Sequence, residues 1–148
     1  MQAHAGSCTV SSTGLAFGAY QPLTFTGKLI SQDVDSLATI SVICYNMQTG
    51  GTYTIALGPS MVGSDNRVDI RYLANASDND FMAFNVYTDT NRTTVWGDGA
   101  TGALINGSIP TGTSNSSLWV YGRIPAGQNT LKPGSFSGSF TLTLTYNP

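Results

Sequence analysis

Apolar and polar side chains alternate with a period of two in several short segments of this 148-residue chain. The clearest case lies near the C-terminus, where threonines separate four apolar residues: Phe140, Leu142, Leu144 and Tyr146. A period of two places neighbouring side chains on opposite faces of an extended strand, so that one face can meet a core and the other water. The same alternation recurs at residues 39–44, 52–57, 82–87 and 118–124. The chain is therefore predicted to consist of half-buried strands.

Clusters of glycine, proline, asparagine, aspartate and serine separate these segments, as expected for tight turns. No stretch shows a convincing 3.6-residue period, and charged residues, which long helices need, make up only 9% of the chain. We therefore predict an all-β fold, an antiparallel β-sandwich with a single domain over residues 8–148. Residues 98–117 are rich in Gly, Ser, Thr and Asn, and are expected to form a long surface loop.

The N-terminus and the two cysteines indicate the cellular compartment in which the protein folds. Residues 1–7 are expected to be a leader remnant or a disordered N-terminus, because Ala3 and Ala5 match the small-x-small pattern that precedes a signal-peptidase site. Cys8 and Cys44 both lie in strand-like segments, and no CxxC motif is present. A disulfide, which implies an oxidising compartment, is the better interpretation. Two buried free thiols are the alternative.

Charge and histidine content disfavour many functions. The net charge is −2 and no basic block exists, so nucleic acid and anionic membranes are poor partners. No apolar run approaches the roughly 18 residues of a membrane span, so no membrane insertion is expected. His4 is the sole histidine, which removes most acid–base, Ser–His and zinc chemistry. We expect no catalytic residues, no metal site and no cofactor, and predict a binding or building protein rather than an enzyme.

A series of short motifs covers nearly the whole chain in a fixed order. It comprises Cys8, Leu15-x-Phe17-Gly18-x-Tyr20-x-Pro22, Cys44, Phe84-Asn85-Val86-Tyr87-Thr88-Asp89, Val95-Trp96-Gly97-Asp98-Gly99, residues 120–128, Gly134-Ser135-Phe136 and the strand at 142–146. No single motif is decisive, but together they resemble the spore coat protein U (SCPU) domain family. That family includes subunits of archaic (Csu-type) chaperone–usher pili.

The resemblance implies an immunoglobulin-like pilin sandwich that is secreted to the periplasm, held there by a chaperone and assembled at the cell surface by an outer-membrane usher. Pilins of this type lack their last strand, and the N-terminal segment of a neighbouring subunit fills the gap. The resemblance also implies a disulfide between Cys8 and Cys44.

The C-terminal strand is a candidate interaction site independently of the resemblance, because an alternating apolar strand at the edge of a sheet pairs readily with another chain. The expected contacts with a donor strand are Phe140, Leu142, Leu144 and Tyr146. The alternative is that this strand is covered within the chain and the domain is complete.

The segment before Cys8 departs from the pattern of polymerising pilins. Its seven residues include no alternating large apolar side chains, so it is not expected to serve as a donor strand. Three hypotheses remain. The chain is the N-terminal adhesin domain of a two-domain tip subunit, a pilin whose donor segment has been removed, or a whole SCPU protein with a coat or other surface role. The tip adhesin domain is favoured.

A tip adhesin needs a contact surface for hydrophobic surfaces or a host receptor, and the resemblance suggests exposed apolar loops. The candidates are Pro59, Met61, Val62, Leu104, Ile105 and Ile109; the alternative is that both loops fold back onto the ends of the sandwich. A carbohydrate-binding module, with Trp96 and Trp119 as a sugar-stacking platform, is a further alternative. Arg71 is expected to anchor a loop rather than bind a ligand.

Overall fold

The computed structural model describes residues 6–14, 33–59, 67–75, 80–128, 136, 138 and 140–147. Within them the chain forms eight strands and no helix. In chain order they are β1 (Ser7–Ser12), β2 (Val34–Met47), β3 (Gly51–Leu57), β4 (Arg71–Asn75), β5 (Asp80–Tyr87), β6 (Ile105–Ile109), β7 (Gly112–Ile124) and β8 (Leu142–Asn147).

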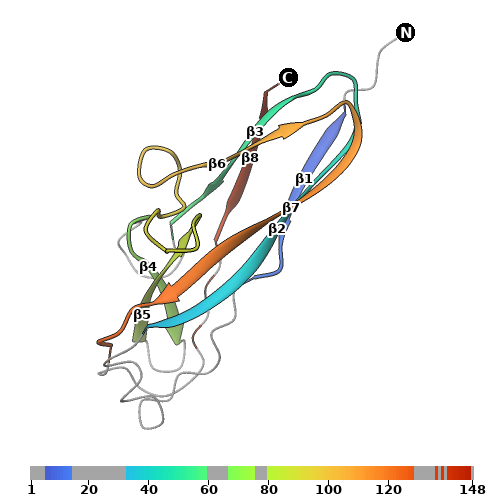
Figure 1. Ribbon diagram of the computed structural model, residues 1–148. Coiled ribbons are helices and arrows are strands. Elements are labelled where there is room, and N and C mark those ends of the chain that lie inside the picture. Colours follow the sequence, from blue (N-terminus) through green and yellow to red (C-terminus); the bar gives the residue numbers. More distant parts are fainter. Residues whose placement is uncertain are drawn as a thin grey trace.

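The strands form two antiparallel sheets with the core between them (Figure 1). The larger sheet has the order β1-β2-β7-β5-β4 and the smaller one β6-β3-β8. Among the described strands β1 and β4 are the edges of the larger sheet, and β6 and β8 are the edges of the smaller one. The prediction of an all-β, sandwich-like arrangement of antiparallel sheets is confirmed.

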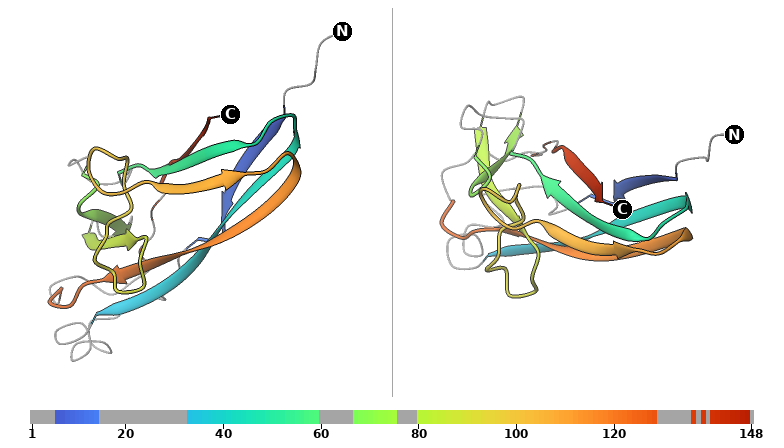
Figure 2. Two further views of the ribbon diagram at one scale, coloured as in Figure 1. Left: turned by 45° about the horizontal axis from the view of Figure 1, so that its top comes forward. Right: turned by 90° about the horizontal axis from the view of Figure 1, so that it is seen from above.

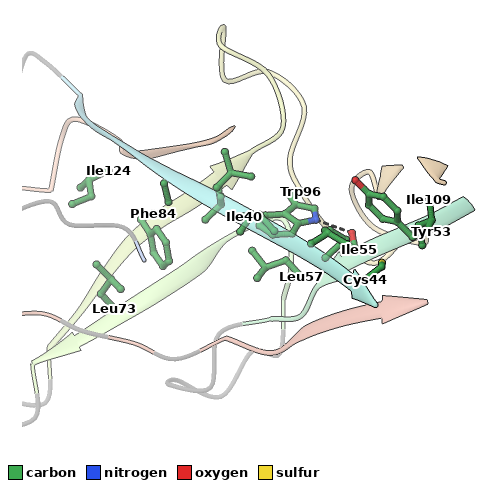
Figure 3. Close-up of a cluster of buried hydrophobic side chains, with 14 of the residues drawn as sticks. Ile40, Cys44, Tyr53, Ile55, Leu57, Leu73, Phe84, Trp96, Ile109 and Ile124 are labelled. Atoms are coloured by element: carbon green, nitrogen blue, oxygen red, sulfur yellow. Dashed lines mark hydrogen bonds between the residues drawn. The ribbon is translucent and has the colours of Figure 1, made fainter. Parts of the chain in front are cut away.

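The core is made by the faces that the alternation predicted to be apolar. On β2 and β3 the inward side chains are almost completely buried; they are Ala38, Ile40, Val42, Cys44, Tyr53, Ile55 and Leu57. The same core cluster contains Met82, Phe84 and Val86 of β5, Val120 and Ile124 of β7, and Met47, Leu73, Trp96 and Ile109. Figure 3 shows part of this cluster. Because the intervening residues of β2 and β7 face outward, one surface of the larger sheet is left to water.

The two longest strands, β2 and β7, pair with each other. Their register runs from Val34 opposite Ile124 to Cys44 opposite Ser114. An irregularity then shifts the pairing, so that Met47 lies opposite Gly112. Asn46 sits at this irregularity with a φ of 54°, a left-handed conformation that asparagine tolerates better than most residues.

The expectation of a long loop over residues 98–117 is wrong for most of this segment, although residues 98–104 do lie outside the strands. Residues 105–109 form β6, and residues 112–117 are the first half of β7, paired with β2. Serine, threonine and asparagine are common in loops, but they also suit the water-facing side of a strand, and composition does not separate the two. The alternation of Ile105, Gly107 and Ile109 was the signal for β6.

Candidate functional site

Two strand edges meet on one side of the sandwich. β1 pairs with β2, β8 pairs with β3, and neither has a second partner among the described strands. β8 nevertheless lies beside β1, as the view from above in Figure 2 shows. The strand edges of the two sheets therefore lie beside each other with no described strand paired between them, and we call this line of contact the β1/β8 gap.

A row of half-buried apolar side chains follows this gap. It consists of Cys8 and Val10 on β1 and of Leu142, Leu144 and Tyr146 on β8, all of which pack against the core without being fully covered by it. The residues between them on the same strands are exposed. The alternation predicted for the C-terminal strand is thus confirmed, and its apolar side faces inward.

Phe140 lies just before β8 and is also half-buried. Its ring meets that of Phe84 edge to face, with centroids 5.3 Å apart and an interplanar angle of 62°, an arrangement that aromatic pairs favour. At the other end of β8, the Tyr146 hydroxyl donates a hydrogen bond to the carbonyl oxygen of Thr49 at 3.0 Å. These contacts fix both ends of the C-terminal segment.

The predicted disulfide between Cys8 and Cys44 is present. The two residues lie opposite each other on β1 and β2, and Cys44 is completely buried. The bond therefore ties β1, which borders the β1/β8 gap, to a buried position on its neighbour β2.

Arg71 anchors the turn after β3, as expected. Its guanidinium donates hydrogen bonds to the carbonyl oxygens of Leu57 and Gly58 at 2.7 and 2.9 Å, and to Oδ1 of Asn85 at 2.7 Å. Arg71 has no exposed surface. Burial lowers the pKa of Arg71 to about 10, while the Asp98 carboxylate acts in the opposite direction. The guanidinium therefore stays charged at neutral pH.

Asn85 is a core residue that the alternation did not reveal. The alternation at residues 82–87 places Asn85 on the face opposite to Phe84 and Val86, yet it is buried beneath the residues that precede β4. Its amide nitrogen donates to the carbonyl oxygens of Val68 and Asp69 at 3.0 and 2.8 Å. A buried arginine and a buried asparagine together hold three segments in place, and no sequence pattern marks that pair.

Most of the described apolar residues that were candidates for exposed binding loops do not lie on exposed loops. Ile105 and Ile109 lie on β6, and Ile109 is 3% exposed, so the expectation of an exposed loop is wrong for them. Pro59 and Leu104 are outside the strands but only half-exposed. Met61 and Val62 lie outside the described residues.

The two tryptophans do not form one platform. Trp96 is 2% exposed, and its indole nitrogen donates to the carbonyl oxygen of Ile55 at 2.9 Å (Figure 3). Trp119 is 58% exposed on the outer face of the larger sheet. The hypothesis of a joint Trp96–Trp119 sugar platform is therefore wrong, because Trp96 belongs to the core.

Charged side chains gather at one end of that outer face. Arg123 donates to both carboxylate oxygens of Asp35, at 2.8 and 3.2 Å, and lies 3.3 Å from a carboxylate oxygen of Asp33. Arg92 lies over the ring of Tyr121, with its guanidinium carbon 5.6 Å from the ring centroid. The hydrogen bond from Arg123 has the largest effect and lowers the pKa of Asp35; burial, the next largest effect, raises it, and the charges of Arg123 and Arg92 lower it further.

In the part of the chain that the structure describes, no three His, Cys, Asp or Glu side chains gather closely enough to hold a metal ion. That same part contains no helix with the length and apolar character needed to cross a membrane.

These features define a class: a disulfide-linked β-sandwich domain with open strand edges on one side. Residues 2–143 match the Spore Coat Protein U domain, and the chain belongs to that family. The chain is also similar to Protein U of Myxococcus xanthus, with 29% identity over 150 residues that cover 95% of this chain and 78% of that protein. The resemblance found in the sequence motifs is thereby confirmed at the level of the family.

Proposed function

We propose that this chain is a subunit of a cell-surface assembly, a pilus or a coat, that accepts a β-strand from a neighbouring subunit in the β1/β8 gap. The observation that carries the proposal is that two strand edges and a row of half-buried apolar side chains lie along the same gap. A strand paired with β8 would form a ladder of main-chain hydrogen bonds and cover the row at the same time.

The energetics favour such an insertion. Leu142, Leu144 and Tyr146 are each only partly covered, so a donor strand with alternating apolar residues would complete their burial and bury its own side chains. About four newly buried large side chains correspond to a gross gain of about 6–12 kcal/mol. Ordering the donor strand offsets part of this gain.

The disulfide supports a route through an oxidising compartment. In the narrower version of the proposal, the chain has the immunoglobulin-like pilin fold without its last strand and travels through the periplasm. A chaperone holds it there, and an outer-membrane usher adds it to a pilus. Among the versions considered, the tip adhesin domain remains the favoured one, with a donor-accepting pilin and a coat protein as the alternatives. These partners rest on the family resemblance.

The test is complementation by a peptide. The probe is a peptide of alternating Val and Thr, as long as β8 and carrying a Lys at each end for solubility. The control peptide has the same composition in a scrambled order. At a concentration about 100 times its dissociation constant, the alternating peptide should raise the thermal midpoint of the wild-type protein by about 5–10 °C.

Two variants on the same strand locate the effect. Leu144→Ala removes an inward side chain of the gap, and we expect it to reduce the peptide-induced shift. Thr143→Ser changes an outward side chain and should leave that shift unchanged. If the alternating peptide produces no shift in the wild-type protein, the gap is already covered within the chain and the proposal is wrong.

A further inference from the structure

The most exposed large apolar side chains in the described residues share one surface, the outer face of the larger sheet. They are Leu37, Tyr45, Phe81 and Trp119, and Trp119 is the most exposed of the four at 58%. Trp119 and Leu37 are diagonal neighbours on the adjacent strands β7 and β2, since Leu37 lies opposite Tyr121. Two exposed apolar side chains therefore lie on neighbouring strands of this face.

On one side of Trp119 and Leu37, the neighbouring outward side chains are short and carry hydroxyl groups. Thr39 lies directly opposite Trp119, and the hydroxyl of Thr13 continues the row, accepting a hydrogen bond from the backbone N–H of Thr39 at 3.0 Å. The next row crosses three strands and consists only of serines: Ser11 on β1, Ser41 on β2 and Ser117 on β7. We call Trp119, Leu37, Thr39, Ser41 and Ser117 together the Trp119 platform.

The Trp119 platform carries no charge. Among the described residues, Asp33, Asp35 and Arg123 lie on this face beyond the row of Leu37 and Tyr121, and Arg92 lies over the Tyr121 ring; these charged groups pair with one another. A ligand on the platform therefore meets one flat aromatic surface and a set of neutral groups that both donate and accept hydrogen bonds. That combination suits a neutral ligand with an apolar face and many hydroxyls.

We propose that the Trp119 platform binds a neutral polysaccharide. A pyranose ring has a face of C–H groups that can stack on the indole of Trp119, and equatorial hydroxyls that can reach the serine and threonine rows. Adjacent strands are about 4.8 Å apart, which is close to the length of one pyranose unit. A sugar chain lying across the strands would thus place successive rings over β7, β2 and β1.

A protein partner fits this surface less well. The cores of protein interfaces are enriched in Tyr, Trp, Met and Arg and depleted in Ser, whereas the neighbours of Trp119 on one side are serines and threonines. The polysaccharide site does not depend on strand exchange in the β1/β8 gap, because it lies on the outer face of the larger sheet. The two proposals can therefore fail independently.

The test uses the whole protein and a panel of neutral polysaccharides: insoluble cellulose and chitin in pull-down assays, and soluble amylose and β-1,3-glucan in fluorescence titrations. The chain contains two tryptophans. Trp96 is buried, so a ligand on Trp119 should change the emission and protect the exposed indole from acrylamide quenching. We expect at least one member of the panel to bind, and Trp119→Ala to weaken that binding about tenfold or more.

Matched variants separate the possible causes. Tyr45→Ala and Phe81→Ala remove other exposed rings from the same face and should bind the polysaccharide as the wild type does. Ser117→Val keeps the shape but removes a hydroxyl, so it should weaken sugar binding, whereas it would strengthen a purely apolar contact. Because the Trp119 side chain is mostly exposed, Trp119→Ala should keep the wild-type thermal midpoint.

Several outcomes would overturn the proposal. These are failure of the whole panel to bind, binding that survives Trp119→Ala, and tighter binding by Ser117→Val. Self-association of the wild-type protein that Trp119→Ala abolishes, without any sugar binding, would assign the face to a contact between copies of this chain instead.

Discussion

Tyr53 on β3 covers Gly107, its opposite neighbour on the edge strand β6, so that the ring occupies the space where any side chain at position 107 would begin. The ring is 3% exposed, and burial raises the pKa of its hydroxyl. Gly107 thus lets an aromatic residue lie flat across the edge of the smaller sheet.

Gly107→Ala should destabilise the protein by about 1–3 kcal/mol, because the ring of Tyr53 has to move. In a Tyr53→Leu background the same change should cost little or even stabilise the strand, since alanine is preferred to glycine in a strand. Urea denaturation of the four proteins of this double-mutant cycle measures the coupling. Additive effects would contradict the contact, and Asn106→Ala, on the exposed neighbour, is the control.

Loss of the Cys8–Cys44 disulfide should lower the free energy of unfolding by about 3–4 kcal/mol in the chain-entropy description, since the bond closes a loop with a sequence separation of 36. The measurement is urea denaturation with and without reductant. The Cys8→Ser/Cys44→Ser double variant should be weakened to a similar extent and should not respond to the reductant. Equal stability of the oxidised and reduced wild-type protein would show that β1 is held by its hydrogen bonds alone.

Replacing Arg71 should be severe, because the carbonyl oxygens of Leu57 and Gly58 lose the guanidinium donor and the Asn85 amide oxygen keeps only the backbone N–H of Val86. We expect Arg71→Met to cost about 3 kcal/mol or more. Arg71→Lys should also be destabilising, since an ammonium group cannot reproduce the planar fork. Arg67→Ala, in an exposed pair with Asp69, should change the stability by about 0.5 kcal/mol at most. A mild effect of Arg71→Met in thermal or urea unfolding would refute the anchoring role.

Acid should destabilise the protein, because the folded structure stabilises the charged form of several aspartates and lowers their pKa. The Arg123 hydrogen bond lowers the pKa of Asp35, and backbone hydrogen bonds from Thr101 and Ala100 lower that of Asp98. A carboxyl with a depressed pKa in the folded state contributes its full stability above its unfolded pKa, about 3.9 for Asp, and loses that contribution as the pH falls through the folded value.

The urea midpoint should therefore be flat above about pH 5 and fall on acidification below about pH 4. Asp35→Asn should be less stable at neutral pH and should show a shallower acid decline. If Asp35→Asn follows the wild-type acid profile, its pairing with Arg123 contributes nothing measurable.

Much of the fold could be predicted from the sequence because burial in a strand repeats every second residue. That periodicity identified the inward faces of β2, β3, β5, β7 and β8 and supported a sandwich. It failed at residues 112–117, where serine, threonine and asparagine form the outward side of β7. It also failed at Asn85, which is buried by a segment that approaches from outside its own strand.

Alternation and turn residues predicted the class of fold and the inward faces of the main strands, since these depend on local geometry, and two cysteines left a single possible pairing for a disulfide. Tertiary structure decided which strands became edges, which tryptophan entered the core and which remained in solvent, and where Arg71 found its acceptors. These outcomes depend on contacts between segments far apart in the chain, and side-chain chemistry read along one strand carries no information about what will cover it.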